Sequence, residues 1–427
     1  MSALLPPRRI VGGSPREGSR DPGPLRGLVL YGAITFAFLA ASAAPTPLYA
    51  LYQESWGLSP ITLTVIYASY PLALMLALLT LGSLSGALGR RRVVLAAIAL
   101  QAVAMGVFLL APNASVLILA RVLQGVATGT ATAAFAAALV DLDRQRGAFV
   151  NSLAPLLGMA FGALGSGAIA TFAPTPASTV FLTLLVIFCA LLATGGLLPE
   201  THQPQPGARA SLAIRLRVPA AARRAVWSTA PILIAVWSIG GFVLSLGPHL
   251  AADLTGSDDP LLGGLLVLLL TGAGALAVLL HRTHPASPVL LAGSASLVLG
   301  GAATMAAEAT RSPMLLLLGT VVAGYGFGAA FQGALQTILP LAAAHERSEL
   351  TSAVYVICYL ANAIPALGAG VLTSLFGLRT AVYAVGGLVV ALSLVGLAAA
   401  LVRSRSHSLP TAIDPVLPSD AACPQGS

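Results

Sequence analysis

One arginine lies deep in an apolar stretch of this chain. Arg121 is the only charged residue in the run from Ala114 to Val140. A guanidinium inside a membrane costs roughly 2.5 kcal/mol or more even on lenient insertion scales, so it is seldom kept for packing alone. Such a group can pair with an anion or shift the pKa of a neighbour, but it does not release its own proton under ordinary conditions. Arg121 is therefore predicted to be a functional residue.

The residues that follow Arg121 at helical spacing are polar or small. Gln124, Gly125, Thr128 and Gly129 would form a stripe that another helix or a substrate could approach closely. The string RVLQG from Arg121 to Gly125, followed by Gly129, resembles the fourth-helix signature of the major facilitator superfamily of transporters. The resemblance implies a link between Arg121 and proton coupling. It also implies two related helix bundles with a substrate site between them, near the bilayer midplane.

Composition predicts an integral membrane protein. Of the 427 residues, 57% are hydrophobic and only 8% are charged, whereas charged residues make up about 25% of soluble domains. The apolar runs last about 20 residues, as helical spans do, while barrel strands would alternate over about 10. We expect an all-α protein with twelve spans, at about residues 27–49, 60–83, 93–111, 114–140, 149–171, 178–198, 226–250, 261–280, 287–307, 314–341, 350–375 and 380–402.

The arginines predict the orientation of the chain. All 22 basic residues are Arg, and only Arg311 and Arg379 fall on the side opposite to the rest. Because cytoplasmic loops carry an excess of positive charge, both termini are expected in the cytoplasm. The net charge of +8 then fits an inner membrane face near anionic lipids, and no nucleic-acid partner is indicated. Arg-only basicity with abundant Ala, Gly and Leu suggests a bacterial inner membrane.

The two halves of the chain resemble each other at an offset of 203 residues. Pro45 matches Pro248 and Gly125 matches Gly328, and two further matches have the same offset. This pattern favours a duplicated six-helix unit. The expected organisation is a cytoplasmic tail over 1–26, a first bundle over 27–198, an Arg-rich cytoplasmic linker over 199–225, a second bundle over 226–402 and a cytoplasmic tail over 403–427.

The loop between the second and third expected spans also resembles a superfamily signature, in which a tight turn carries a basic cluster. The family pattern has an Asp and a basic residue where this chain has Gly86 and Ala87, so gating through that acidic residue is in question. The alternative is that the arginines only anchor the topology. Two prolines near the outer ends of spans one and seven could bend those helices to close a gate. The gating candidates are Gly82, Gly89, Arg90, Arg91, Pro45 and Pro248.

Polar and aromatic side chains deep in the expected spans are candidates for a substrate cavity. Each alone could instead form an interhelical hydrogen bond, worth about 1 kcal/mol. As a set they suit a neutral or amphipathic organic molecule better than an inorganic ion. No acidic residue stands at the centre of a span, and Glu54 and His249 are the best proton-site candidates. The cavity candidates are Tyr67, Tyr70, Thr128, Trp237, Tyr325, Gln332, Gln336, Tyr355, Tyr359 and Asn362.

These features favour a secondary transporter that works by alternating access. Proton-driven export of a drug-like or amphipathic molecule is favoured over uptake of a small metabolite, although exporters usually carry Gly-Pro where this chain has Gly165-Ser166. A receptor or scaffold on the same fold would explain the missing loop Asp. No catalytic, metal, cofactor or ATP-binding pattern is found, so an enzyme is not expected. The expected partners are a small-molecule substrate, protons and the lipid bilayer, with the protein acting as a monomer.

Overall fold

The computed structural model describes residues 24–202, 216–343 and 346–407. Every regular element in these ranges is a helix, and twelve helices are long and apolar enough to cross a membrane. The predicted all-α class and number of spans are therefore confirmed. Most of the predicted tails and the middle of the predicted linker lie outside the described residues.

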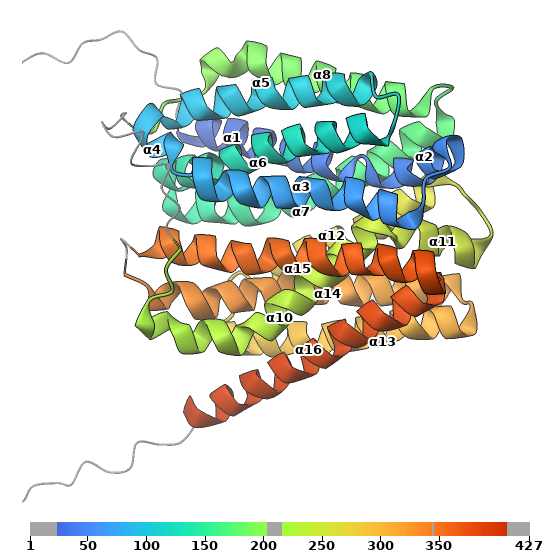
Figure 1. Cartoon of the computed structure of the whole chain (residues 1–427). Helices are drawn as coiled ribbons and strands as arrows, with labels where there is room; N and C mark the ends of the chain where they lie inside the picture. The colour runs from blue at the N-terminus through green and yellow to red at the C-terminus, as the bar shows by residue number, and fades with distance from the viewer. Residues whose placement is uncertain (1–23, 203–215, 344–345, 408–427) are drawn as a thin grey trace, which may run out of the picture.

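The first half forms the upper bundle in Figure 1, coloured blue to green. Helix α3 begins at a side-chain cap, since the Ser59 hydroxyl accepts a hydrogen bond from the Thr62 amide, and Pro60 at its first position needs no acceptor. The elements are α1 (Pro24–Ala43), η1 (Thr46–Leu48), α2 (Tyr49–Trp56), α3 (Pro60–Leu81), α4 (Leu84–Leu88), α5 (Arg90–Leu109), α6 (Ala114–Leu142), α7 (Arg144–Phe172), α8 (Pro176–Ala193) and η2 (Thr194–Leu197).

The second half forms the lower bundle, coloured yellow-green to red (Figure 1). Its elements are α10 (Ala220–Ser245), α11 (Gly247–Thr255), α12 (Pro260–Leu280), α13 (Ala286–Thr310), α14 (Pro313–Ile338), η3 (Leu339–Leu341), α15 (Arg347–Phe376) and α16 (Leu378–His407). We call the end of the molecule that carries α4 the basic end, because Arg90, Arg146 and Arg223 lie there. The opposite end, with α2 and α11, is the far end.

The helices that open the two bundles break at matching positions. The predicted span 27–49 is not one straight helix, because α1 ends at Ala43 and the chain passes through η1 into α2. The predicted span 226–250 is likewise divided, since α10 ends at Ser245 and α11 follows. Proline lacks a backbone N–H and cannot continue a helix without a lost hydrogen bond, which accounts for breaks at Pro45 and Pro248.

The duplicated glycines also pack in matching ways. A Cβ on Gly125 in α6 would lie 2.8 Å from the Ala73 Cβ in α3. A Cβ on Gly328 in α14 would lie 2.7 Å from the Gly274 Cα in α12. The fourth helix of each half therefore approaches the second helix of the same half through a position that only glycine can occupy.

Candidate functional site

Arg121 lies about two turns from the start of a long, well-capped helix, α6. The Asn113 side chain accepts a hydrogen bond from the Val116 amide, at 3.1 Å, and starts α6. At the other end Asp143 stops α6 and caps the first turn of α7 through the amides of Gln145 and Arg146. Between these caps Arg121 is only 1% exposed. A charge in this position needs compensation from its neighbours.

All the direct partners of the Arg121 guanidinium are neutral. Its Nη1 donates to the Ser42 carbonyl at 2.9 Å and to Gln124 Oε1 at 2.8 Å, while Gln124 Nε2 donates to the Ala41 carbonyl at 2.9 Å. The guanidinium carbon lies 4.8 Å from the ring centre of Tyr70, within the range of a cation–π interaction. Arg121 and Gln124 thus join α6 to the end of α1 and to α3.

The small members of the stripe bring α6 against α3. A Cβ on Gly125 would lie 2.5 Å from the Tyr70 carbonyl, and one on Gly129 would lie 2.3 Å from the Leu74 carbonyl. Thr128 is fully buried and donates to the Gln124 carbonyl at 2.9 Å, which satisfies its hydroxyl within the helix. The glycines therefore have a packing role, and they set the distance between Arg121 and the ring of Tyr70.

A hydrogen-bonded and aromatic network continues from Arg121 into the second bundle. Tyr67, whose ring centre lies 5.8 Å from the Arg121 guanidinium carbon, donates across the bundle interface to Asn362 Oδ1 at 2.9 Å. Asn362 Nδ2 in turn donates to the Trp237 carbonyl at 3.3 Å. The Trp237 ring lies 5.1 Å from that of Tyr359. Candidates from both bundles therefore meet around Arg121.

Tyr355 belongs to the same aromatic group, while three other cavity candidates lie elsewhere. The rings of Tyr355 and Tyr359 stack with centres 5.9 Å apart. By contrast, the Tyr325 hydroxyl contacts His281 Nε2, and Gln332 Nε2 donates to the His281 carbonyl at 3.2 Å. The Gln336 Oε1 is buried and makes no hydrogen bond. Tyr325 and Gln332 therefore contact the α12–α13 connection, and Gln336 lies on the same face of α14.

Hydrogen bonds between the bundles lie at the far end or near the middle of the described structure. Thr46 donates to the Leu244 carbonyl at 3.0 Å, the Ile61 amide donates to Ser374 Oγ at 3.3 Å, and Thr171 donates to Asp259 Oδ1 at 2.5 Å. Tyr67 and Asn362 add the fourth, near the middle of their helices. Toward the basic end, the hydrogen bonds between described residues stay within one bundle or the other.

Close glycine contacts reinforce this closure of the far end. A Cβ on Gly370 in α15 would lie 2.0 Å from Thr64 Oγ1 in α3, and one on Gly264 in α12 would lie 2.6 Å from the Ala163 carbonyl in α7. Pro45 and Pro248 are buried at the breaks beside this contact. The two bundles are therefore in tight contact at the far end.

The loop at the basic end has an acidic partner that sequence reasoning missed. The Glu200 carboxylate accepts hydrogen bonds from the amides of Arg90 and Arg91, at 2.8 and 3.2 Å, and so caps α5. Gly89 has a φ of +94°, and its Cβ would lie 2.7 Å from Glu200 Oε2. The Arg90 side chain pairs with Asp141 at 3.4 Å. Gly82 lies at the end of α3 and opens the turn into α4. Glu200 thus supplies a carboxylate where the loop signature lacks its Asp.

The two proton-site candidates lie away from Arg121. Glu54 is exposed on α2, and His249 is half-buried on α11 with Asp253 as a charged neighbour. Asp253 also pairs with Arg311 at 2.5 Å, and Arg311 pairs with the buried Glu308 at 3.3 Å. Neither candidate is part of the network around Arg121, so any coupling between them would act through the conformation of the far end.

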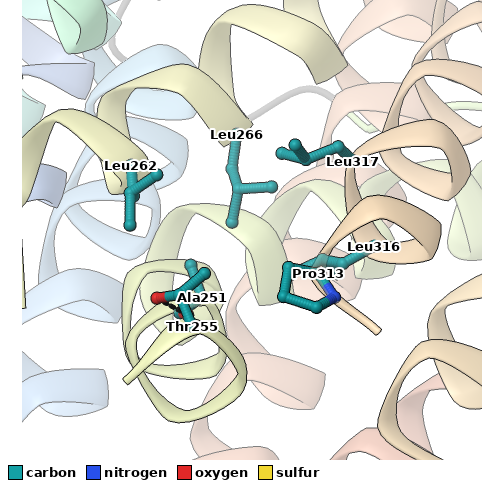
Figure 2. A pocket seen from close by; sticks show the side chains of 7 residues that line it. All are labelled: Ala251, Thr255, Leu262, Leu266, Pro313, Leu316 and Leu317. Atoms are coloured by element: carbon teal, nitrogen blue, oxygen red, sulfur yellow. Dashed lines mark hydrogen bonds between the residues drawn. The ribbon is translucent and has the colours of Figure 1, made fainter. Parts of the chain in front are cut away.

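A small apolar pocket at the far end is not suited to selective recognition of a polar molecule. Figure 2 shows it between α11, α12 and α14 within the second bundle. Its one polar side chain is that of Thr255, whose hydroxyl already donates to the Ala251 carbonyl at 2.7 Å. The lining consists of Ala251, Thr255, Leu262, Leu266, Pro313, Leu316 and Leu317.

Solved structures of transporters share this fold. The human organic anion transporter MFSD10 has 19% sequence identity and a TM-score of 0.65, over 88% of this chain and 100% of that one. The nucleoside transporter NupG has 12% identity and a TM-score of 0.68, over 88% and 99%. A bacterial homologue of the human lysosomal transporter Spinster, in an inward-facing and occupied conformation, has 15% identity and a TM-score of 0.72, over 92% and 100%.

The sequence itself carries the family assignment. No curated protein matches it. The profile of the Major Facilitator Superfamily matches residues 30–366, which contain the buried Arg121, its glycine stripe and the Tyr67–Asn362 contact between the two bundles. With its twelve helices in two bundles, the chain belongs to the major facilitator superfamily of transporters.

Proposed function

We propose that this protein is a secondary transporter that exports an amphipathic organic molecule in exchange for protons. It acts as a monomer in a bacterial inner membrane, with the basic end in the cytoplasm. The domain boundaries expected from the sequence remain part of this proposal. The protein itself performs no covalent chemistry on its substrate.

The observation that carries the proposal is the arrangement of contacts between the bundles. The hydrogen bonds that join them lie at the far end or near the middle, and Gly370 and Gly264 bring their helices into contact there. Contacts of this kind can separate while each bundle keeps its own packing. Rocking of the two bundles would then expose the network around Arg121 to one side of the membrane at a time.

The residues of the network around Arg121 favour an organic molecule as the substrate. Trp237, Tyr355 and Tyr359 supply aromatic surface, and Asn362 and Tyr67 supply hydrogen-bonding groups. Apolar surface with a few placed polar groups is typical of sites for small organic molecules. The transporters of similar structure are named for different substrates, organic anions in one case and nucleosides in another. The substrate therefore has to be inferred from the residues of this chain.

Proton coupling in this proposal acts through the far end. Glu54 and His249 lie there, on the short helices that follow the breaks at Pro45 and Pro248. A change of charge on either group would alter the electrostatics beside the closed interface. Export by proton exchange requires that protonation shifts the equilibrium between the two conformations and that proton binding and substrate binding oppose each other.

The test is flux in inverted vesicles that contain the purified protein. Labelled amphipathic compounds of positive, negative and zero charge would be offered with and without an imposed proton gradient, and vesicles with a known exporter would serve as control. Accumulation that depends on the gradient is expected for at least one charge class. Accumulation in right-side-out vesicles alone would show uptake, and saturable binding without flux in either orientation would favour a receptor.

A further inference from the structure

The Arg121 guanidinium has an edge that donates no hydrogen bond of normal geometry to the described residues. Both of its hydrogen bonds are donated by Nη1, to Ser42 and Gln124. Its Nε is buried and makes no hydrogen bond, and no hydrogen bond from Nη2 is found within the described part of the chain. Nε and Nη2 form one side of the planar fork, and that side matches the two oxygens of a carboxylate.

A tyrosine hydroxyl lies close to the same guanidinium. Tyr49 is 2% exposed, its hydroxyl makes no hydrogen bond of normal geometry, and it interacts electrostatically with Arg121. Tyr49 in α2 and Arg121 in α6 therefore interact with each other inside the first bundle, and neither the Tyr49 hydroxyl nor the Arg121 Nε has a hydrogen bond of normal geometry to an acceptor. Buried donors without acceptors carry a desolvation cost, so a ligand that supplies acceptors there would gain from both.

The charge of Arg121 has no counter-charge in the described structure. None of the ion pairs among described residues includes it. The only other charged side chain classed as buried there is Glu308, which pairs with Arg311 at the far end. Glu54 and Asp141 lie at opposite ends of the first bundle. A negative partner for Arg121 would therefore have to come from the transported molecule.

The neighbouring aromatic group defines what the rest of that molecule would contact. Tyr67 lies beside the guanidinium and also reaches Asn362 in the second bundle. Separation of this pair would uncover Arg121 from the bundle interface. An apolar or aromatic body could then pack on Trp237, Tyr355 and Tyr359 while its charged group approached Arg121.

We propose that the substrate is an organic anion whose carboxylate binds the Nε–Nη2 edge of Arg121, with an apolar body on the aromatic group between the bundles. The anion inference narrows the proposed function to substrates of one charge class. It rests on the proposed function for the claim that the bound molecule is transported. On binding, the carboxylate gives up its hydrogen bonds with water and accepts hydrogen bonds from Arg121 and the Tyr49 hydroxyl instead. Arg121 is then a binding residue for the substrate, whatever group carries the proton.

The test is a charge series with one aromatic body. Binding of 2-naphthoate, 2-naphthamide and 2-naphthylmethylammonium to the purified full chain would be measured by equilibrium dialysis, with benzoate and decanoate as further carboxylates. The expected result is affinity for 2-naphthoate at least about tenfold above that for the amide. Arg121→Gln should remove this preference and leave amide binding unchanged. Arg121→Lys should keep part of it, because Lys retains the charge without the fork.

Two further variants separate binding from a structural effect. Tyr49→Phe keeps the ring and should weaken carboxylate binding alone, whereas Arg224→Gln removes an exposed arginine at the basic end and should change nothing. The inference would be overturned if 2-naphthoate and the amide bound with equal affinity, if the ammonium bound best, or if none of the three carboxylates bound saturably. It would also be overturned if Arg121→Gln lost affinity equally for all three naphthalene probes. Gradient-driven flux of a cation, without binding of any carboxylate, would overturn the anion inference but leave the proposed transport function standing. Binding of a carboxylate without any flux would support the anion site but contradict the proposed transport function.

Discussion

A single methyl group at Gly370 should shift the protein away from the conformation described. Gly370 in α15 faces Thr64 in α3, so the contact joins the two bundles. The added Cβ of Gly370→Ala would lie 2.0 Å from Thr64 Oγ1 and 2.9 Å from both its Cβ and Cγ2. Thr64 is fully buried and cannot turn away from all three contacts. Gly368→Ala is the matched control, because nothing lies within 4 Å of its Cβ.

The size of the effect follows from where the clash occurs. Overpacking by one methyl group costs about 1 to 3 kcal/mol. The gain from replacing a helical glycine by alanine, about 0.5 to 1 kcal/mol, is the same for both variants and for both conformations. The cost falls only on the conformation in which the far ends of α3 and α15 touch. The equilibrium should therefore move toward far-end opening by a factor of about 5 to 150 in Gly370→Ala.

Distances between spin labels on opposite bundles measure this shift. Ser55→Cys and Asp258→Cys place exposed labels at the far end of the first and second bundles, and Arg146→Cys with Arg223→Cys does the same at the basic end. The native cysteines would first be replaced by serine. Gly370→Ala should lengthen the far-end distance and shorten the basic-end distance.

The control variant decides how the result is interpreted. Gly368→Ala should leave both distance distributions as in the parent protein. If Gly370→Ala also leaves them unchanged, in protein that remains folded, the far-end contact does not separate and the alternating-access argument drawn from it is wrong.

Three further predictions follow from other contacts. Thr171→Val removes the hydrogen bond to Asp259 between the bundles, which is worth about 0.5 to 1.5 kcal/mol. The conformation with an open far end should therefore become more populated, by up to roughly tenfold, in the same distance measurement. An unchanged distance distribution would contradict this prediction. Glu200→Gln weakens the cap on α5 and, because Glu200 is exposed, should cost only about 0.5 to 1 kcal/mol, seen as a lower Tm at low salt that 1 M salt largely removes. Burial, and then the neighbouring His284, lower the pKa of His281 from 6.5, so the folded protein favours its neutral form. Its contribution to stability should be complete above pH 6.5 and decline as the pH falls below that value, and His281→Gln should flatten this part of a Tm-against-pH profile; a profile identical to the wild type would refute the assignment.

Much of the architecture is predictable because membrane helices follow from length and composition. The apolar runs of about 20 residues gave the correct number of spans, and the special role of Arg121 follows from the cost of its charge in an apolar segment. The breaks at Pro45 and Pro248 were recognised as bends. Their effect on helix boundaries was not, because a proline fixes the local backbone but not the path of the chain beyond it.

The parts that were missed depend on contacts between distant residues. Glu200 caps α5 from 110 positions away, so no local pattern around Arg90 could reveal it. Depth within a span likewise does not say which neighbour a side chain meets. Tyr325 and Gln332 have the depth of cavity residues, yet they face His281, whereas Phe331 of the same helix contacts Trp237. The helical spacing of Tyr325 and Gln332 was the one available signal that they form a group of their own.

The most direct test of the account compares Arg121→Gln with the wild type in gradient-driven transport. Both proteins, with Arg224→Gln as the control for loss of an exposed arginine, would be reconstituted to equal amounts in proteoliposomes. Initial rates would be measured for the compound that the vesicle panel identifies. We expect Arg121→Gln to insert and remain folded but to lose transport, while Arg224→Gln retains it. Wild-type rates in Arg121→Gln would contradict the central role assigned to this buried charge.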